Sequence, residues 1–174
     1  MNRTALLSCA IAAAFALSAC NQQESPAEAG QDVSQAQQEA SKDVNQAQQQ
    51  AAQDAAEAQR KLDAARAEAN ADMAKARANA SDQNDVSDAS QNAQEDVAEQ
   101  KSDTMESQAK ARYDVAVTKA EADHKVATEK CEALPSNEQS ACKDEADQAL
   151  DDAKAAAKQE LDSAQAAADN ADQD

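Results

Sequence analysis

Apolar residues follow a helical period along residues 31–80. They recur in steps of three, four and four at Val33, Ala36, Ala40, Val44, Ala47, Ala51, Ala55, Ala58 and Leu62. Eleven residues make three helical turns, so this stripe runs almost straight along one face. Arg66 and Arg77 fall where the stripe needs apolar residues, so we expect it to weaken after Leu62. The pattern predicts a long helix over 31–80 with a narrow, weak packing face.

Residues 81–92 interrupt this pattern with a run of Ser, Asp and Asn, which compete with the helical backbone for hydrogen bonds. We expect a hinge there. Apolar spacing through Val86, Ala89 and Val97 survives the interruption, so a continuous frayed helix is the open alternative.

Residues 93–170 read as an antiparallel helical hairpin with its turn at 134–136, because Pro135 ends a helix. Ser136 and Gln139 have the spacing of a capping box that starts the second helix. The first helix carries one apolar face and, beside it, a stripe of Val115, Ala122 and Val126; the face consists of Tyr113, Ala116, Ala120, His124, Ala127, Cys131 and Leu134. The expected inward face of the second helix consists of Cys142, Ala146, Ala149, Ala153, Leu161, Ala164 and Ala168.

Composition restricts both the fold and the chemistry. Ala dominates the apolar content, with one Gly and two Pro in the whole chain, which favours an all-α fold of long Ala-rich helices over any β structure. The scarcity of large apolar residues favours a flexible or partly disordered N-terminal part. A net charge of −18 excludes nucleic acid as a partner. With one His and one Gly, we expect no catalytic triad, no phosphate loop, no cofactor and no small-molecule substrate.

The N-terminus has the zones of a secretory signal. Arg3 precedes an apolar run from Ala5 to Leu17, which is too short to span a membrane. Leu17-Ser18-Ala19-Cys20 resembles the lipobox of bacterial lipoproteins. The resemblance implies removal of residues 1–19 and a lipid on Cys20; a simple secretory signal is the alternative. It further implies membrane attachment through that lipid, and Asn21 in place of Asp implies the outer membrane, facing the periplasm. Residues 20–30 are expected to form a flexible tether.

Cys131 and Cys142 flank the predicted turn at similar heights in the hairpin. An exported protein meets an oxidising compartment, so we expect these two cysteines to form a disulfide. A redox pair is disfavoured because it would have C-x-x-C spacing. A zinc site is disfavoured because His124 is the only His and no fourth ligand is evident.

Two further resemblances bear on function. Residues Lys130–Leu134 and Ala141–Lys143, with Tyr113 upstream, resemble an uncharacterised proteobacterial family of Cys-stapled helical-hairpin envelope proteins. The eleven-residue Ala repeats resemble those of late-embryogenesis-abundant proteins. The first implies a Cys-stapled hairpin but no activity. With the lipobox and the lack of catalytic residues, we expect a non-enzymatic envelope lipoprotein with a structural or adaptor role, and its partner is expected to be a second copy or another envelope protein. The second implies an acidic, disordered stress protectant that becomes helical on drying.

Overall fold

The computed structural model describes residues 25–79 and 83–171, which form three α-helices and no strand. Helix α1 runs from Pro26 to Asn79, α2 from Gln83 to Glu132 and α3 from Ser136 to Ala171. The predicted all-α class is confirmed. The signal-like segment and Cys20 lie outside the described residues.

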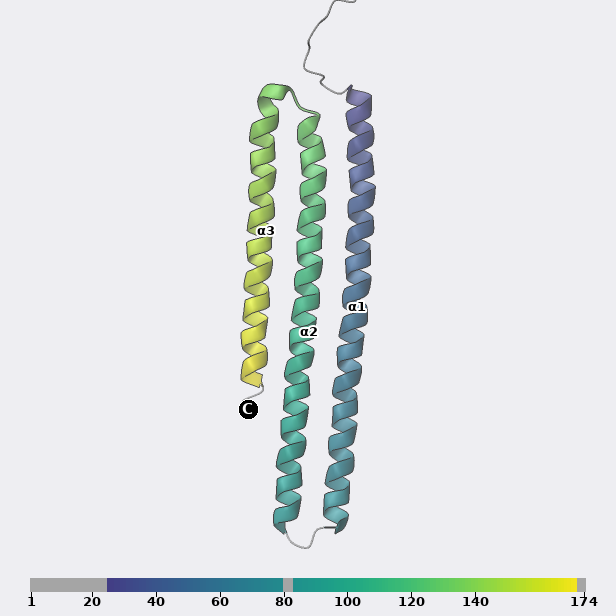
Figure 1. Ribbon diagram of the computed structural model, residues 1–174, viewed down its shortest axis with the longest axis vertical. Coiled ribbons are helices and arrows are strands. Elements are labelled where there is room, and N and C mark those ends of the chain that lie inside the picture. Colours follow the sequence, from purple (N-terminus) through teal and green to yellow (C-terminus); the bar gives the residue numbers. More distant parts are fainter. Residues whose placement is uncertain (1–24, 80–82, 172–174) are drawn as a thin grey trace, which may run out of the picture.

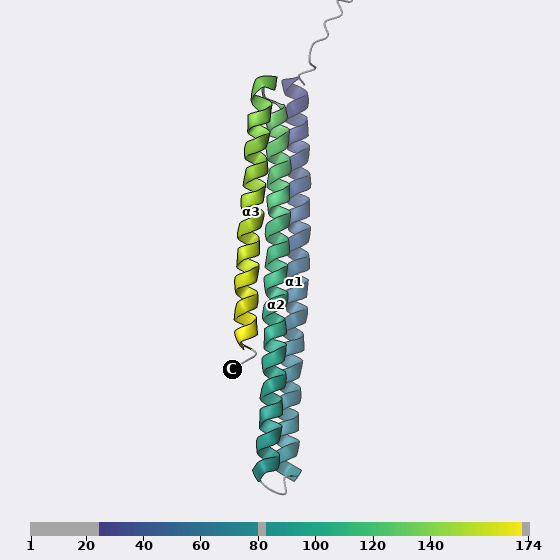
Figure 2. The same cartoon turned by 60° about the vertical axis from the view of Figure 1, so that its left-hand side comes forward.

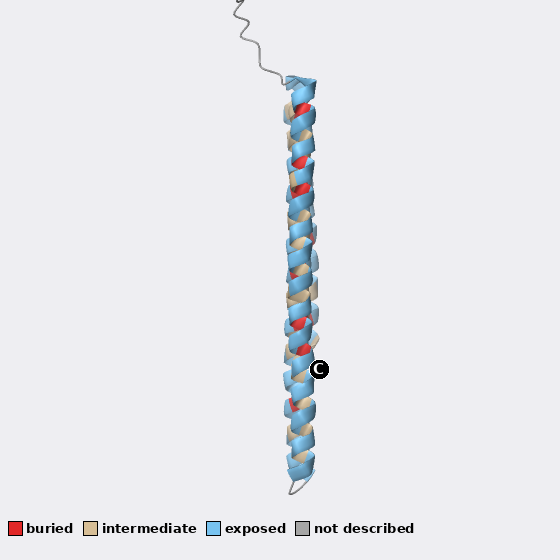
Figure 3. Cartoon of the chain, turned by 90° about the vertical axis from the view of Figure 1, so that its right-hand side faces the viewer, coloured by how far each residue is buried: buried red, intermediate tan, exposed pale blue. Residues whose placement is uncertain are grey.

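The helices lie side by side as an open layer, not as a closed bundle (Figure 1). Helix α2 is antiparallel to both neighbours, and in the described residues α1 packs on α2 and α3 packs on α2, without contact between α1 and α3. Seen edge-on, the helices line up one behind another (Figure 3), and the intermediate view agrees (Figure 2). At about 1.5 Å per residue, α1 is about 80 Å long.

The α1 stripe is buried against α2, as its period predicts. Ala36, Ala40, Ala58 and Leu62 are buried, and Leu62 is 5% exposed. The expected weakening after Leu62 is confirmed, because the fully buried residues of α1 end there. The stripe nevertheless does not stop at Leu62. The step after Leu62 is three residues, to Ala65, so Arg66 and Arg77 lie exposed beside the stripe. The stripe continues through the half-buried residues Ala65, Ala69, Met73 and Ala76.

Helix α2 carries two eleven-residue rows, one for each neighbour. Thr104 is hydrogen bonded to α1, which places its row, with Val115 and Val126, on that side. Cys131 is bonded to α3, which places its row, with Ala109 and Ala120, on the other. The two stripes predicted for this helix are therefore both packing faces.

The surface of α2 also changes beyond the described end of α3. Below Ala98 the α3-facing row changes to exposed Gln91 and Ser87, whereas the α1-facing row keeps Ala93 and Val97. A third helix would find no apolar surface there. Beyond the described end of α3, the layer is a hairpin of α1 and α2 alone. Near that end, Ser102 Oγ of α2 donates a hydrogen bond of 3.1 Å to the Ala168 carbonyl of α3.

Two predicted boundaries are shifted. Helix α1 ends at Asn79 and α2 begins at Gln83, so an interruption does fall at the start of the hinge expected at 81–92, but residues 83–92 are helical. Val86 and Ala89 are half-buried there at helical spacing, and residues 80–82 lie outside the described part. The tether expected at 20–30 is helical from Pro26, because a cap at Ser25 starts α1 early.

The predicted inward face of α3 is wrong at Ala149 and Ala153, which are exposed. Ala146 and Ala168 are buried as predicted. Ala157, which was not predicted, is buried at the same eleven-residue interval, and Leu150 is half-buried. A leucine buries more apolar area than an alanine, so α3 is turned to bury Leu150.

Candidate functional site

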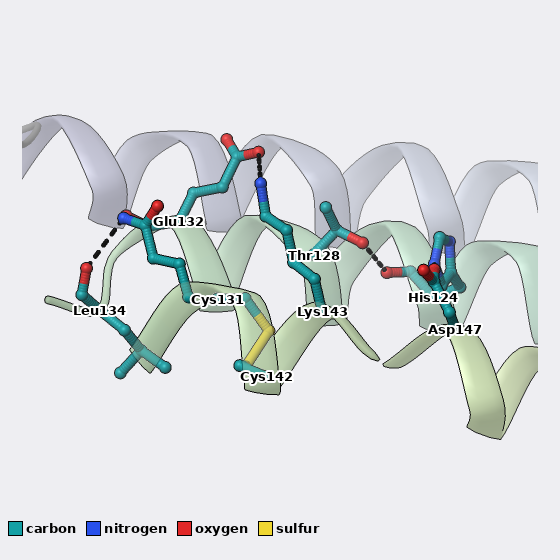
Figure 4. A network of polar contacts seen from close by, with 9 residues as sticks. His124, Thr128, Cys131, Glu132, Leu134, Cys142, Lys143 and Asp147 are labelled. Atoms are coloured by element: carbon teal, nitrogen blue, oxygen red, sulfur yellow. Dashed lines mark hydrogen bonds and ion pairs between the residues drawn. A yellow bond between two sulfur atoms is a disulfide. The ribbon is translucent and has the colours of Figure 1, made fainter. Parts of the chain in front are cut away.

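The most strongly connected part of the layer is the end of the α2–α3 hairpin, shown in Figure 4. Cys131 and Cys142 form a disulfide with their Cα atoms 5.5 Å apart. Cys131 is 1% exposed, while Cys142 is half-buried. The predicted pairing is therefore present, and the separation is that of an ordinary disulfide.

The turn beside this disulfide is closed by Gln139. Its Nε2 donates hydrogen bonds of 2.9 Å to the carbonyls of Glu132 and Leu134, at the end of α2. Gln139 therefore does not act in the capping box that we predicted with Ser136. Its side chain satisfies carbonyls that the helix end leaves without helical partners. Lys143 Nζ also pairs with Glu132 Oε1 at 2.7 Å (Figure 4).

Farther along the hairpin, polar side chains join α2 to α3. His124 Nε2 is hydrogen bonded to Asp147 Oδ1 at 2.6 Å, and the His124 side chain is 27% exposed. Lys154 pairs with Glu121 at 2.8 Å, and the hydrogen bond raises the pKa of Lys154. His124 thus has a structural partner on the opposite helix. No group of three or more His, Cys, Asp or Glu side chains suited to a metal occurs in residues 25–79 and 83–171.

Among the described residues, Thr104 and Lys125 of α2 make polar contacts with α1. Thr104, which is 4% exposed, has its hydroxyl 3.2 Å from the Ala58 carbonyl and 2.7 Å from that of Gln100. Lys125 pairs with Glu39 across the helices. The hydrogen bond between them lowers the pKa of Glu39 and raises that of Lys125.

The start of α1 has a capping box that our sequence analysis missed. Ser25 Oγ donates to Glu28 Oε2 at 2.7 Å, and the Glu28 amide donates back to Ser25 Oγ at 3.3 Å. Pro26 occupies the first helical position, where a missing N–H costs nothing. The sequence signal was present as Ser-Pro-Ala-Glu. The hydrogen bonds from Ser25 lower the pKa of Glu28.

This capped start lies at the same end of the layer as the disulfide-linked turn (Figure 1). Ser25, Ala29 and Val33 of the α1 start line one groove with Lys130 and Ala133 near the end of α2. Cys20, the predicted lipidation site, lies outside the described residues, five positions before Ser25. The chain thus leaves the predicted anchor and enters the layer at its most strongly connected end.

Comparisons with known proteins give no match. Neither family models, curated proteins nor solved structures resemble the chain. Among the described helices, none is both long and apolar enough to cross a membrane. Among the described residues, the arrangement provides contacts that hold the helices together: the Cys131–Cys142 disulfide, ion pairs between helices, and hydrogen bonds from side chains to backbone carbonyls.

Proposed function

We propose that this chain is a non-enzymatic lipoprotein of the cell envelope, held by lipid on Cys20, whose helical layer has a structural or adaptor role. The observation that carries the proposal is the Leu-Ser-Ala-Cys sequence at Leu17–Cys20, directly after a short apolar run. Two or three acyl chains would anchor the protein stably, whereas a single chain binds only marginally.

The position of the α1 start supports this role. Ser25 lies five positions after Cys20, and an extended chain spans at most about 3.5 Å per residue. A lipid on Cys20 would therefore keep the first turn of α1 within about 17 Å of the membrane. The disulfide end of the layer would face the membrane, with the α1–α2 junction projecting about 80 Å away.

The charge of the chain also favours a lipid over electrostatic adsorption. Removal of residues 1–19 takes away Arg3 and leaves a net charge of −19. Such a surface is repelled by anionic headgroups, so the layer would stand off the membrane unless a covalent lipid held it. Asn21, in place of Asp, supports the outer membrane as the location.

Lipidation is tested by expressing the protein in bacteria fed an alkyne fatty acid. We expect labelling and membrane sedimentation of the unmodified chain. Both should be lost in Cys20→Ala and retained in Cys9→Ala, the matched cysteine substitution within the leader. Equal labelling of Cys20→Ala would refute the anchor. Density-gradient separation of the membranes then tests the outer-membrane assignment.

A second candidate is a stress protectant of the disordered, drying-responsive kind. The eleven-residue alanine period favours it, and that period extends from α1 through α2 and α3. Circular dichroism of residues 21–174 in dilute buffer and during drying separates the two functions. A stable helical signal in dilute buffer at 25 °C contradicts the protectant, whereas helix that appears only on drying contradicts the rigid layer.

A further inference from the structure

The two broad sides of the layer differ in charge. One side carries the cross-helix ion pairs, namely Lys125 with Glu39, Glu121 with Lys154 and Glu132 with Lys143. We call it the ion-pair side. Because residues eleven apart align on these helices, Lys110 belongs to the same row of α2 as Glu121 and Glu132.

The opposite broad side is centred on a different row of α2, which contains Lys101 and Arg112. By helical phase this row lies between the rows that face α1 and α3, away from Glu121. An open groove of about 470 Å³ supports the placement, because Lys101 lines it with Arg66, Met73 and Val97. Lys130 lines a second groove with Val33 of α1. We call this the basic side.

Charge is sorted between the sides along α2. The acidic residues of this helix fall on the ion-pair side, with the exception of Asp123, which is paired with Lys119. Lys101, Arg112 and Lys130 are exposed and have no ion-pair partner among the described residues. A chain with a net charge of −18 thus presents free cations on one side of its central helix. Lys101 and Arg112 share a row that continues at Asp123, and Lys130 belongs to a neighbouring row.

The flanks of the basic side are small and mostly uncharged. By the same phase, α1 contributes a row of Gln37, Gln48 and Gln59. Helix α3 contributes exposed Ala149 and Ala153, with Glu138 and Glu160 eleven residues before and after Ala149 in the same row. Alanine allows the backbone of another helix to approach closely, and glutamine supplies hydrogen-bond donors and acceptors without charge.

We propose that the basic side binds an acidic, alanine-rich α-helix of a partner protein, which lies along α2 between α1 and α3. Lys101 and Arg112 are eleven residues apart, or about 16 Å along the axis. Carboxylates at the same interval on a straight helix would meet both cations. A second copy that docked through its own basic side would instead oppose like charges. The proposal concerns the layer and does not require lipid on Cys20.

The probe is a fluorescent synthetic helix of about three eleven-residue Ala-rich repeats, with glutamates in one aligned row. Its anisotropy is followed on titration with the full protein, purified in nonionic detergent. We expect binding at low ionic strength, at least tenfold weaker binding to Lys101→Gln/Arg112→Gln, and weaker binding in high salt because screening shortens electrostatic range. A peptide with lysines at the same positions should not bind.

Lys110→Gln is the matched control, because Lys110 is exposed on the same helix two residues from Arg112 but lies on the ion-pair side. It should bind the probe as the unmodified protein does. Equal weakening by Lys110→Gln and Arg112→Gln would overturn the proposal, since overall charge alone would explain binding. Equally strong binding of unstructured polyglutamate would overturn the helical partner. Self-association that Arg112→Gln abolishes would assign the basic side to a second copy instead. Circular dichroism of each variant checks that the fold is retained.

Discussion

Reduction of the Cys131–Cys142 disulfide should loosen α3 and leave α1 unaffected. Helix α3 packs only on α2 in the described structure, and its buried side chains are mainly alanines. Helix α1 has its own contacts with α2, including Thr104 with Ala58. The disulfide therefore stabilises one neighbour of α2 and not the other.

The size of the effect follows from the loop that the disulfide closes. The two cysteines are 11 residues apart in the sequence. Closing a loop of about twelve residues removes chain entropy equivalent to about 2.8 kcal/mol at 25 °C. If α3 opens without α1, its opening equilibrium should increase by about a hundredfold, since 1.4 kcal/mol corresponds to a factor of ten.

Hydrogen exchange with mass spectrometry measures this helix by helix. The oxidised protein is compared with protein reduced by a dithiol and alkylated, and amides after Cys142 should lose about a hundredfold in protection. Cys131→Ala/Cys142→Ala serves as the control, because its exchange should not respond to reductant. Protection of α1 in residues 26–79 should not change.

Two results would refute this reasoning. Unchanged protection of α3 after reduction would mean that alanine packing and the ion pairs hold it without the disulfide. An equal loss in α1 and α3 would mean that the layer opens as one cooperative unit, and then the absence of contact between α1 and α3 would not make them independent.

Three further predictions concern α1. Leu62→Ala should lower the free energy of unfolding by about 2–3 kcal/mol in urea titration, because it removes a buried leucine; a loss below about 1 kcal/mol would contradict its place in the core. Gly30→Ala should raise the free energy of unfolding by about 0.5–1 kcal/mol, and with it the thermal midpoint, because an added Cβ has no atom within 4 Å. The control Ala27→Gly should lower the midpoint. A lower midpoint for Gly30→Ala would refute the open helical site. The hydrogen bond to Lys125 lowers the pKa of Glu39, so the pair stabilises the fold at pH 7, and this contribution is lost as the pH falls through the folded pKa of Glu39. The difference in stability between the unmodified protein and Glu39→Gln should therefore vanish in acid. A difference that stays constant with pH would exclude the ionic contribution.

Some contacts between helices could not be predicted from the sequence. Glu39 and Lys125 are 86 residues apart, and nothing in the local sequence of either selects the other. Gln139 had a visible local role as a capping residue, yet its amide bonds the carbonyls of the preceding helix. Both contacts depend on how the helices meet, so the sequence pattern of a single helix could not predict them.

The sequence by itself determined the helices, the packing stripes of α1 and α2, and the cysteine pairing, but not the packing face of α3. Helix propensity and the eleven-residue period act within one helix, and the turn at Pro135 places Cys131 near Cys142, so these features needed no tertiary information.

The tertiary structure decided which neighbour each stripe meets, how far α1 packs beyond Leu62, and that the helices form an open layer. Neighbouring alanine rows bury almost equal areas, so local pattern cannot choose between them. The choice depends on the few larger side chains, such as Leu150 in α3, and on the second row of α2, which gives α1 and α3 separate surfaces.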